Sequence, residues 1–165
     1  MTVINTSPAI HLHAVLCGGL GSLPALIGDV VVPWEVSQEL AAGDDKDDTW
    51  LQIQKRDGII VRSAPLIVHP LLRAQIDLGE AAVIQTALEE AHDTVILDDL
   101  KARRIAAALG LHVTGTPGIL VQAKLAGHLP SVRDAIVALD QRGMWIAPAL
   151  VAKAIRLAGE DLRLP

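Results

Sequence analysis

The chain lacks phenylalanine and tyrosine entirely, and three tryptophans are its only aromatic side chains. The core must therefore be built mainly from Leu, Ile, Val and Ala. The aromatic platforms on which RRM-like and OB-like proteins stack bases are also missing. The single cysteine, Cys17, excludes an internal disulfide and fits a reducing cytoplasm. We expect its thiol to be buried and inert, because it ends an apolar stretch.

Long hydrophobic runs and a basic leader are absent as well. No apolar run reaches the roughly 18 residues that a membrane span needs. The N-terminus has no basic region before its apolar residues, so we expect no signal peptide. The mean hydropathy is +0.40, which indicates a well-filled core and is compatible with an apolar surface covered by a partner. These features predict a cytoplasmic protein without membrane association.

The charge balance is acidic, with 19 Asp and Glu against 14 Lys and Arg and a net charge of −5. A general nucleic-acid binder is usually basic. Carboxylates gathered around bound cations give the same negative sign for a different reason, and composition does not separate the two. The length of 165 residues predicts one domain over residues 1–165.

Short β-branched runs alternate with helical patterns along the chain. The runs predict strands at residues 2–5, 29–33, 59–63, 94–97 and 112–115. The patterns between and after them predict helices at residues 7–16, 33–43, 47–58, 77–92, 100–110, 116–127, 132–143 and 148–159. Apolar strands separated by helices form parallel sheets covered on both faces, so the fold class is α/β with about five strands.

Polar residues follow three of the predicted strands, and ligands bind open parallel sheets beyond their carboxyl ends. These residues are Asn5 to Ser7, Asp98 with Asp99, and Thr114 to Thr116. Each set has two interpretations, since helix starts also need polar caps. Ser7 is expected to cap the first helix. The Asp98–Asp99 doublet either caps the helix that follows or contributes a metal ligand. Thr116 is expected to cap its helix, whose amides also suit a phosphate.

Other acidic residues lie near helix starts. Glu80 suits the positive end of a helix dipole, but it also lies where the chain enters the crevice, with Asp77 as its N-cap or a second ligand. Glu35 and Glu39 share a helix face, which is either solvated or near a cation. The acidic run 44–48 is expected to be a solvated loop. Oxygen ligands without His or Cys favour Mg²⁺ or Mn²⁺ over Zn²⁺.

The histidines give no further site. His11 and His13 are two apart on a predicted helix and point to different faces, and no zinc spacing occurs. The segment "GGLGS" (18–22) meets neither the phosphate-loop nor the dinucleotide pattern, so it is expected to be a turn. The GxSxG motif of serine hydrolases is absent.

Five segments in a fixed order resemble the PIN-domain proteins. They are "VINTSPAI", "VVVPWEVSQEL", "LGEAAVIQTALE", "ILDDLKARRIAAALGL" and "VTGTPGILVQAKLAG". The resemblance extends from Val3 to about Trp145 and is strongest to the prokaryotic subgroup that begins with Asn-Thr-Ser-Pro, which is similar to VapC-type toxins. It implies a three-layer α/β/α sandwich and an acidic pocket that binds Mg²⁺ or Mn²⁺. It also implies a metal-dependent endoribonuclease, a toxin of a type II toxin–antitoxin system, a homodimer, and a small antitoxin that enters the acidic groove.

The resemblance also implies roles for single residues. The family's second acid falls on Glu39, its third on Glu80 and its fourth on Asp98 or Asp99; these four are the expected catalytic residues and metal ligands. The first acid, Asp in most PIN domains, is Asn5 here, a neutral and weaker ligand. Residues expected to meet RNA are Ser7, Thr116, Lys101, Arg103 and Arg104, although the three cations have an alternative role in pairing with helix-face acids.

Two other functions are compatible with parts of this pattern. The first is a catalytically weak or inactive PIN-shaped module that binds nucleic acid or protein, because Asn5 removes one ligand charge. The second is a phosphoryl-accepting receiver-like domain, which is also five-stranded. In such domains the paired aspartates follow the first strand, which here ends in Asn5, so this function is disfavoured.

Overall fold

The computed structural model describes residues 1–43, 49–54 and 56–161. Its centre is a five-stranded sheet in the order β3-β2-β1-β4-β5, and every pairing is parallel. The strands are β1 (Thr2–Ile4), β2 (Val30–Val32), β3 (Ile59–Val61), β4 (Thr94–Ile96) and β5 (His112–Thr114). The predicted α/β class with five parallel strands is confirmed.

The central strands are buried on both faces, as expected for a parallel sheet between helices. Val3 and Ile4 of β1, all of β2, and Val95 and Ile96 of β4 have no exposed surface. The edge strands β3 and β5 are only partly buried. Because all five strands run in one direction, their carboxyl ends meet at one edge of the sheet.

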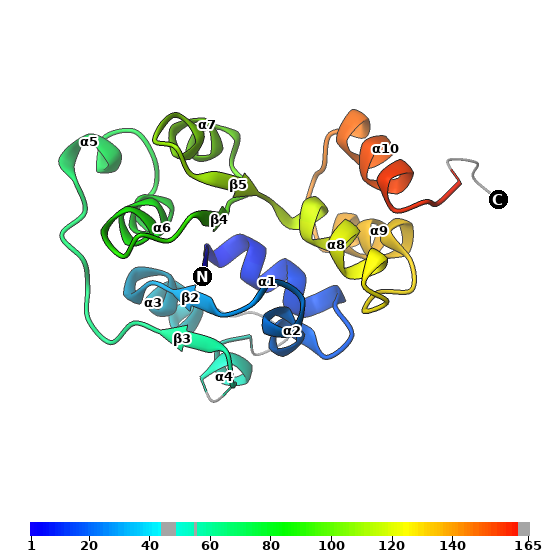
Figure 1. The fold of residues 1–165 in the computed structure, drawn as a ribbon, viewed down its shortest axis with the longest axis horizontal. Helices are drawn as coiled ribbons and strands as arrows, with labels where there is room; N and C mark the ends of the chain where they lie inside the picture. The colour runs from blue at the N-terminus through cyan, green and yellow to red at the C-terminus, as the bar shows by residue number, and fades with distance from the viewer. Residues whose placement is uncertain (44–48, 55, 162–165) are drawn as a thin grey trace.

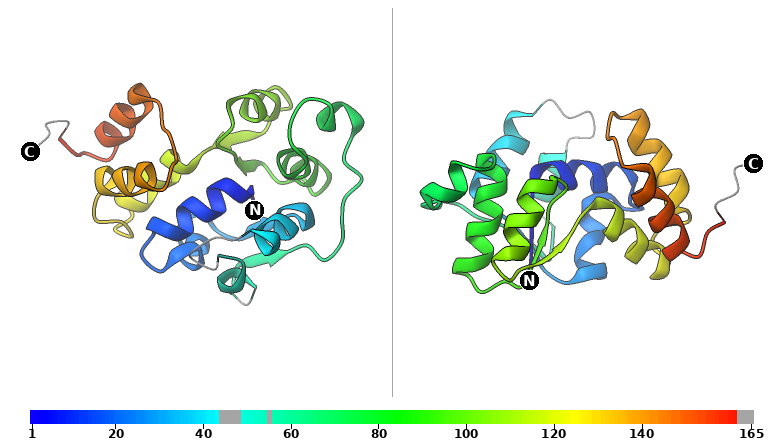
Figure 2. Two further views of the ribbon diagram at one scale, coloured as in Figure 1. Left: turned by 180° about the vertical axis from the view of Figure 1, so that it is seen from behind. Right: turned by 90° about the horizontal axis from the view of Figure 1, so that it is seen from above.

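Helices flank the sheet on both sides. They are α1 (Thr6–Val15), η1 (Gly19–Ser22), α2 (Leu23–Ile27), α3 (Trp34–Ala42), α4 (Thr49–Ile53), α5 (Pro70–Arg73), α6 (Leu78–Glu89), α7 (Leu100–Ala108), α8 (Thr116–Leu125), α9 (Val132–Gln141) and α10 (Pro148–Leu157). One side carries α6, packed on β1 and β4, together with α7 against β5; the other carries α1, α2, α8 and α9 (Figure 1). Figure 2 shows α10 beside α8 and α9, near the C-terminus. Helix α3 contacts both α1 and α6, so it connects the two groups.

Several short helices differ from the prediction. The segment expected to be a turn forms η1 and leads into α2, where Leu20 and Leu23 are fully buried. Helix α5 was not predicted, and α4 ends at Ile53, before the predicted end at residue 58. Helices this short depend on tertiary packing, which local sequence does not report. The acidic run 44–48 lies outside the described residues.

Two predicted helix caps are wrong. Helix α1 begins at Thr6, one residue before Ser7, so Asn5 occupies the N-cap position, although its side chain makes no cap hydrogen bond. Helix α8 has Gly115 at its N-cap, and Thr116 is its first helical residue. The prediction of a buried thiol is also wrong, because Cys17 is exposed just after α1.

In the described part of the chain, no single helix is long and apolar enough to cross a membrane. Among the described residues, one pair of helices, Thr6–Val15 and Gly19–Ile27, reaches that length and composition together, and this pair is bent by 90°.

Candidate metal centre

A cavity of about 400 Å³ opens at the carboxyl edge of the sheet. Its walls come from the β1–α1 junction, α3 and the start of α6, three segments far apart in sequence. The residues that line it are Asn5, Ser7, Glu39, Asp77, Gly79 and Glu80. The structure therefore brings together the first three metal-ligand positions expected from the sequence.

Asn5 lies at the bottom of this cavity, directly after β1. Its backbone N–H donates to the carbonyl of Ile96 in β4 at 3.2 Å, which fixes the residue to the sheet. The residue is 8% exposed, and its side-chain Oδ1 is buried without a hydrogen-bond partner among the described residues. Leaving such an oxygen unsatisfied costs on the order of 1–3 kcal/mol. A ligand that accepts a lone pair from Oδ1 would remove that cost.

Glu39 faces Asn5 across Gly79. A Cβ built on Gly79 would lie 2.7 and 2.9 Å from the two carboxylate oxygens of Glu39 and 3.1 Å from Asn5 Oδ1. These three oxygens therefore surround one small space, which the missing side chain of Gly79 leaves open. The hydroxyl of Thr6 donates to Glu39 Oε2 and orients the carboxylate.

Glu80 is the third residue of α6 and lies half-buried beside Glu39. Burial raises the pKa of its carboxyl, and the negative charges of Asp99, Asp77 and Glu39 raise that pKa further. The backbone N–H of Asp77, which donates to Glu80 Oε2 at 3.4 Å, acts in the opposite direction without cancelling the rise. Carboxylates kept close enough to repel one another are stabilised by a cation between them.

This donor set fits a hard divalent cation. It offers the amide oxygen of Asn5 and the carboxylates of Glu39 and Glu80, which are the oxygen ligands that Mg²⁺ and Mn²⁺ prefer. Over residues 1–43, 49–54 and 56–161, no three His, Cys, Asp or Glu side chains form a cluster able to hold a metal ion. Three carboxylates line the cavity, those of Glu39, Asp77 and Glu80, and the expected ligand set combines Glu39 and Glu80 with the neutral Asn5 as its third donor.

The aspartate doublet divides into two different roles. Asp99 caps α7 by accepting a hydrogen bond from the N–H of Ala102 at 2.8 Å. Its negative charge also raises the pKa of Glu80. The Asp98 carboxylate accepts two hydrogen bonds from Thr116, one from its backbone N–H at 2.7 Å and one from its hydroxyl at 2.6 Å. Neither Asp98 nor Asp99 lines the acidic cavity, so the expected preference for Asp98 as the residue that faces the crevice stays a prediction.

His11 is a neighbour of this corner that the sequence did not indicate. Its Nδ1 lies 3.4 Å from Ser7 Oγ and 3.7 Å from Asp98 Oδ2. Both contacts use the same ring nitrogen, so the three side chains cannot pass a proton along a Ser–His–Asp relay. The absence of a GxSxG motif agrees with this geometry.

The residues expected to meet RNA differ in accessibility. Ser7, Lys101 and Arg104 are exposed, whereas Thr116 is fully buried. The N–H of Thr116 is already bonded to Asp98, so it is not free for a phosphate. Arg103 is half-buried, and its Nη1 donates to the carbonyl of Leu97 at 2.8 Å.

The alternative role for the cations, pairing with acids, is not observed. Lys101, Arg103 and Arg104 make no salt bridge within the part of the chain that the structure describes. Glu35 also differs from Glu39. It is 5% exposed, and its Oε1 accepts from the N–H of Leu66 at 3.0 Å. It therefore holds the segment after β3 and does not face the acidic cavity.

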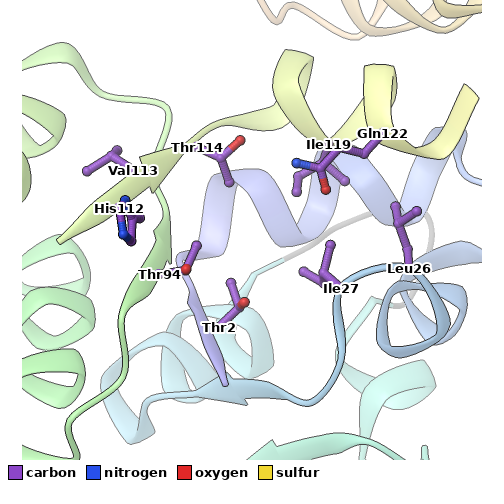
Figure 3. A pocket seen from close by; sticks show the side chains of 9 residues that line it. All are labelled: Thr2, Leu26, Ile27, Thr94, His112, Val113, Thr114, Ile119 and Gln122. Atoms are coloured by element: carbon purple, nitrogen blue, oxygen red, sulfur yellow. The ribbon is translucent and has the colours of Figure 1, made fainter. Parts of the chain in front are cut away.

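A larger cavity of about 460 Å³ lies elsewhere (Figure 3). The first residues of three strands line it, Thr2, Thr94 and His112, together with residues of α2 and α8. It contains no carboxylate and lies toward the opposite ends of the strands. Of the residues expected at the site, Asn5, Ser7, Glu39 and Glu80 line the smaller, acidic cavity.

Comparison with known proteins agrees with this architecture. The model of a protein family described as PIN domain (DUF3368) matches residues 1–160. Searches of curated proteins and of solved structures found no match.

Proposed function

Because the chain belongs to the PIN-domain family, a family of typically metal-dependent nucleases, we propose that it is an endoribonuclease dependent on Mg²⁺ or Mn²⁺. It hydrolyses phosphodiester bonds of RNA at the acidic cavity. The observation that supports this most directly is the meeting of Asn5 Oδ1, buried and unpartnered among the described residues, with both oxygens of Glu39 around Gly79. Glu80, whose pKa is raised by burial and by its acidic neighbours, completes the donor set.

The residues of the cavity have separable roles in this proposal. Glu39, Glu80 and Asn5 hold the cation, and Thr6 keeps the Glu39 carboxylate in one orientation. Bound Mg²⁺ or Mn²⁺ supplies charge that polarises an RNA phosphate and activates a water for in-line attack. Asp99 adds negative potential beside Glu80. Asp98 with Thr116 forms a fixed neighbouring corner rather than a free ligand.

The biological setting is proposed from family resemblance. The protein acts as the toxin of a type II toxin–antitoxin pair in the cytoplasm, as a single domain that forms a homodimer. A small cognate antitoxin blocks it by placing a segment in the acidic groove. Substrate contacts are made by phosphates and shape, since the chain has no Phe or Tyr on which bases stack.

A second function is favoured by one specific observation. The first ligand position holds the neutral Asn5, and the described residues contain no cluster of three His, Cys, Asp or Glu side chains able to hold a metal ion. A PIN-shaped module that binds nucleic acid or protein without cleaving RNA would have this feature. It differs from the nuclease in a simple way, because it would bind RNA but leave it intact in the presence of Mn²⁺.

The experiment compares cleavage of structured RNAs by the wild type and by Glu80→Gln, with Mg²⁺ or Mn²⁺ present. Gln keeps the shape of Glu80 but removes the ligand charge, so we expect cleavage to fall by at least about 100-fold. Glu160→Gln, which changes a carboxylate far from the cavity, serves as the matched control and should cleave normally. Equal cleavage by wild type and Glu80→Gln would exclude the assignment.

A further inference from the structure

A second hollow of about 210 Å³ adjoins the acidic corner on the side of α10. Two cations line it, Arg103 from α7 and Lys153 from α10. Among the described residues its other lining side chains are largely apolar and include no carboxylate; they include Val113, Pro117, Val121, Leu150, Ala154 and Leu157. We call this hollow the α7–α10 groove.

The groove lies beside the corner that holds Asp98, with the backbone at Gly115 between them. Gly115 forms its wall, and a Cβ built on Gly115 would lie 2.5 Å from Arg103 Nη1 and 2.9 Å from Asp98 Oδ1. The backbone alone therefore separates the groove from the aspartate. Arg103 is held in place because its Nη1 donates to the carbonyl of Leu97, at the end of β4.

The two cations of the groove form no salt bridge among the described residues, although the Asp98 carboxylate lies near Arg103. Neither Arg103 nor Lys153 makes a salt bridge in residues 1–43, 49–54 and 56–161, although the chain has a net charge of −5. Helix α8 begins at this wall, and its first N–H, that of Thr116, already donates to Asp98. Lys153 therefore has no carboxylate partner among the described residues, whereas Arg103 lies near Asp98; an anion placed between the two cations would interact with both.

One face of helix α10 forms the wall of the groove opposite Gly115 and Arg103. Leu150, Lys153, Ala154 and Leu157 repeat at helical spacing and all line the groove. Leu150 and Leu157 are 45% and 56% exposed, so this apolar face is not filled by the chain itself. An occupant with a flat apolar part and a negative charge would satisfy both walls.

We propose that the α7–α10 groove holds the nucleotide adjacent to the scissile phosphate of a single-stranded RNA. Its base lies on the apolar wall of α8 and α10, and its phosphate lies between Arg103 and Lys153. This inference rests on the proposed nuclease function, because it places the RNA relative to the acidic cavity. Nucleic acid is favoured over a protein segment because the lining offers two cations and no carboxylate.

The test measures binding of a fluorescein-labelled single-stranded RNA of about 12 nucleotides by fluorescence anisotropy. Glu80→Gln in EDTA is the parent, so the RNA stays intact. Adding Lys153→Ala should weaken binding about threefold to tenfold and reduce the salt dependence by about one phosphate contact. Arg156→Ala is the matched control, since it removes a cation from the same helix but does not line the groove. It should change affinity less than about twofold.

A second measurement reports the position of the base. The same RNA containing 4-thiouridine should photo-crosslink to peptides of α8 or α10, and Ala154→Leu, which fills the groove, should reduce that crosslink. Equal affinities of Lys153→Ala and Arg156→Ala, or crosslinks confined to other helices, would overturn the inference.

The outcomes for the groove and for the nuclease are distinguishable. RNA that binds and crosslinks in the groove but is never cleaved by the wild type with Mn²⁺ would support the groove and contradict the nuclease. Cleavage with identical KM values for the wild type, Lys153→Ala and Arg156→Ala would support the nuclease and contradict the groove.

Discussion

Glu80 belongs to the first turn of α6, and the carboxylate of Glu160 lies against the first turn of α9. Their surroundings nevertheless shift the two pKa values in opposite directions. Glu160 is approached by the N–H groups of Val132 and Arg133 at the start of α9, at 2.6 and 3.0 Å. Burial acts to raise its pKa, but these two hydrogen bonds, the positive charge of Lys124 and the Ser131 hydroxyl together lower the pKa. Burial raises the pKa of Glu80, its three acidic neighbours raise it further, and the 3.4 Å hydrogen bond from Asp77 does not cancel that rise.

The difference separates a structural carboxylate from a candidate functional one. Glu160 accepts two backbone hydrogen bonds from the start of α9, and it thereby connects the chain after α10 to α9. Glu80 is held among like charges at a cost to the folded state, next to the Asn5 oxygen that lacks a partner among the described residues. A bound cation would offset the repulsion between these carboxylates and so remove its cost to the folded state.

The largest expected effect comes from filling the space between the ligands with Gly79→Ala. The added Cβ would lie within 3 Å of both Glu39 oxygens, so the cation loses its position. We expect Mn²⁺ affinity to fall by about 10- to 100-fold, measured by the electron paramagnetic resonance signal of free Mn²⁺. Folding should survive, because Ala favours a helix over Gly by about 1 kcal/mol. Unchanged affinity in a folded variant would place the cation elsewhere.

A smaller effect, opposite in direction, is expected from Asn5→Asp. The substitution adds a negative charge at the first ligand position, so Mn²⁺ affinity should rise about tenfold. Without metal the extra carboxylate beside Glu39 should lower the melting temperature. Calorimetric titration with Mn²⁺ checks the affinity, and thermal melting without metal checks the melting temperature. An affinity that does not change would mean that the side chain of residue 5 does not contact the cation.

The smallest effects test the two glutamates directly by thermal melting without metal. Above the folded-state pKa of Glu80, its ionised form destabilises the fold, so Glu80→Gln should raise the melting temperature by on the order of 1–3 °C. The gain should vanish as pH falls below the pKa of the unfolded chain. Glu160→Gln should lower the melting temperature by a similar amount at neutral pH. That loss should disappear as pH falls through the lowered pKa of Glu160. If both variants changed the melting temperature in the same direction, the proposed difference between Glu80 and Glu160 would be wrong.

The sheet was predictable from sequence because its strands are β-branched runs buried on both faces. Val30 to Val32 and Val95 with Ile96 could serve only in a core, and each predicted strand lies within about two residues of the observed one. Helices η1, α2 and α5 were missed because packing, not propensity, fixes elements of four or five residues.

The candidate site was predictable in its residue types but not in its contacts. Glu39, Glu80 and the aspartate doublet were indicated by motif order. The bond from Thr116 to Asp98, the approach of His11 and the open space at Gly79 depend on residues that are distant in sequence or on neighbouring turns of a helix. A single sequence does not record which of two adjacent aspartates turns toward which partner.

Calorimetric titration of the wild-type protein with Mn²⁺ at neutral pH, beside Glu80→Gln, tests the metal centre most directly. We expect saturable binding to the wild type with a dissociation constant below about 1 mM and a rise in its melting temperature, both largely lost in Glu80→Gln. No heat of binding and no change in melting temperature for the wild type at millimolar Mn²⁺ would contradict a metal centre at the acidic cavity.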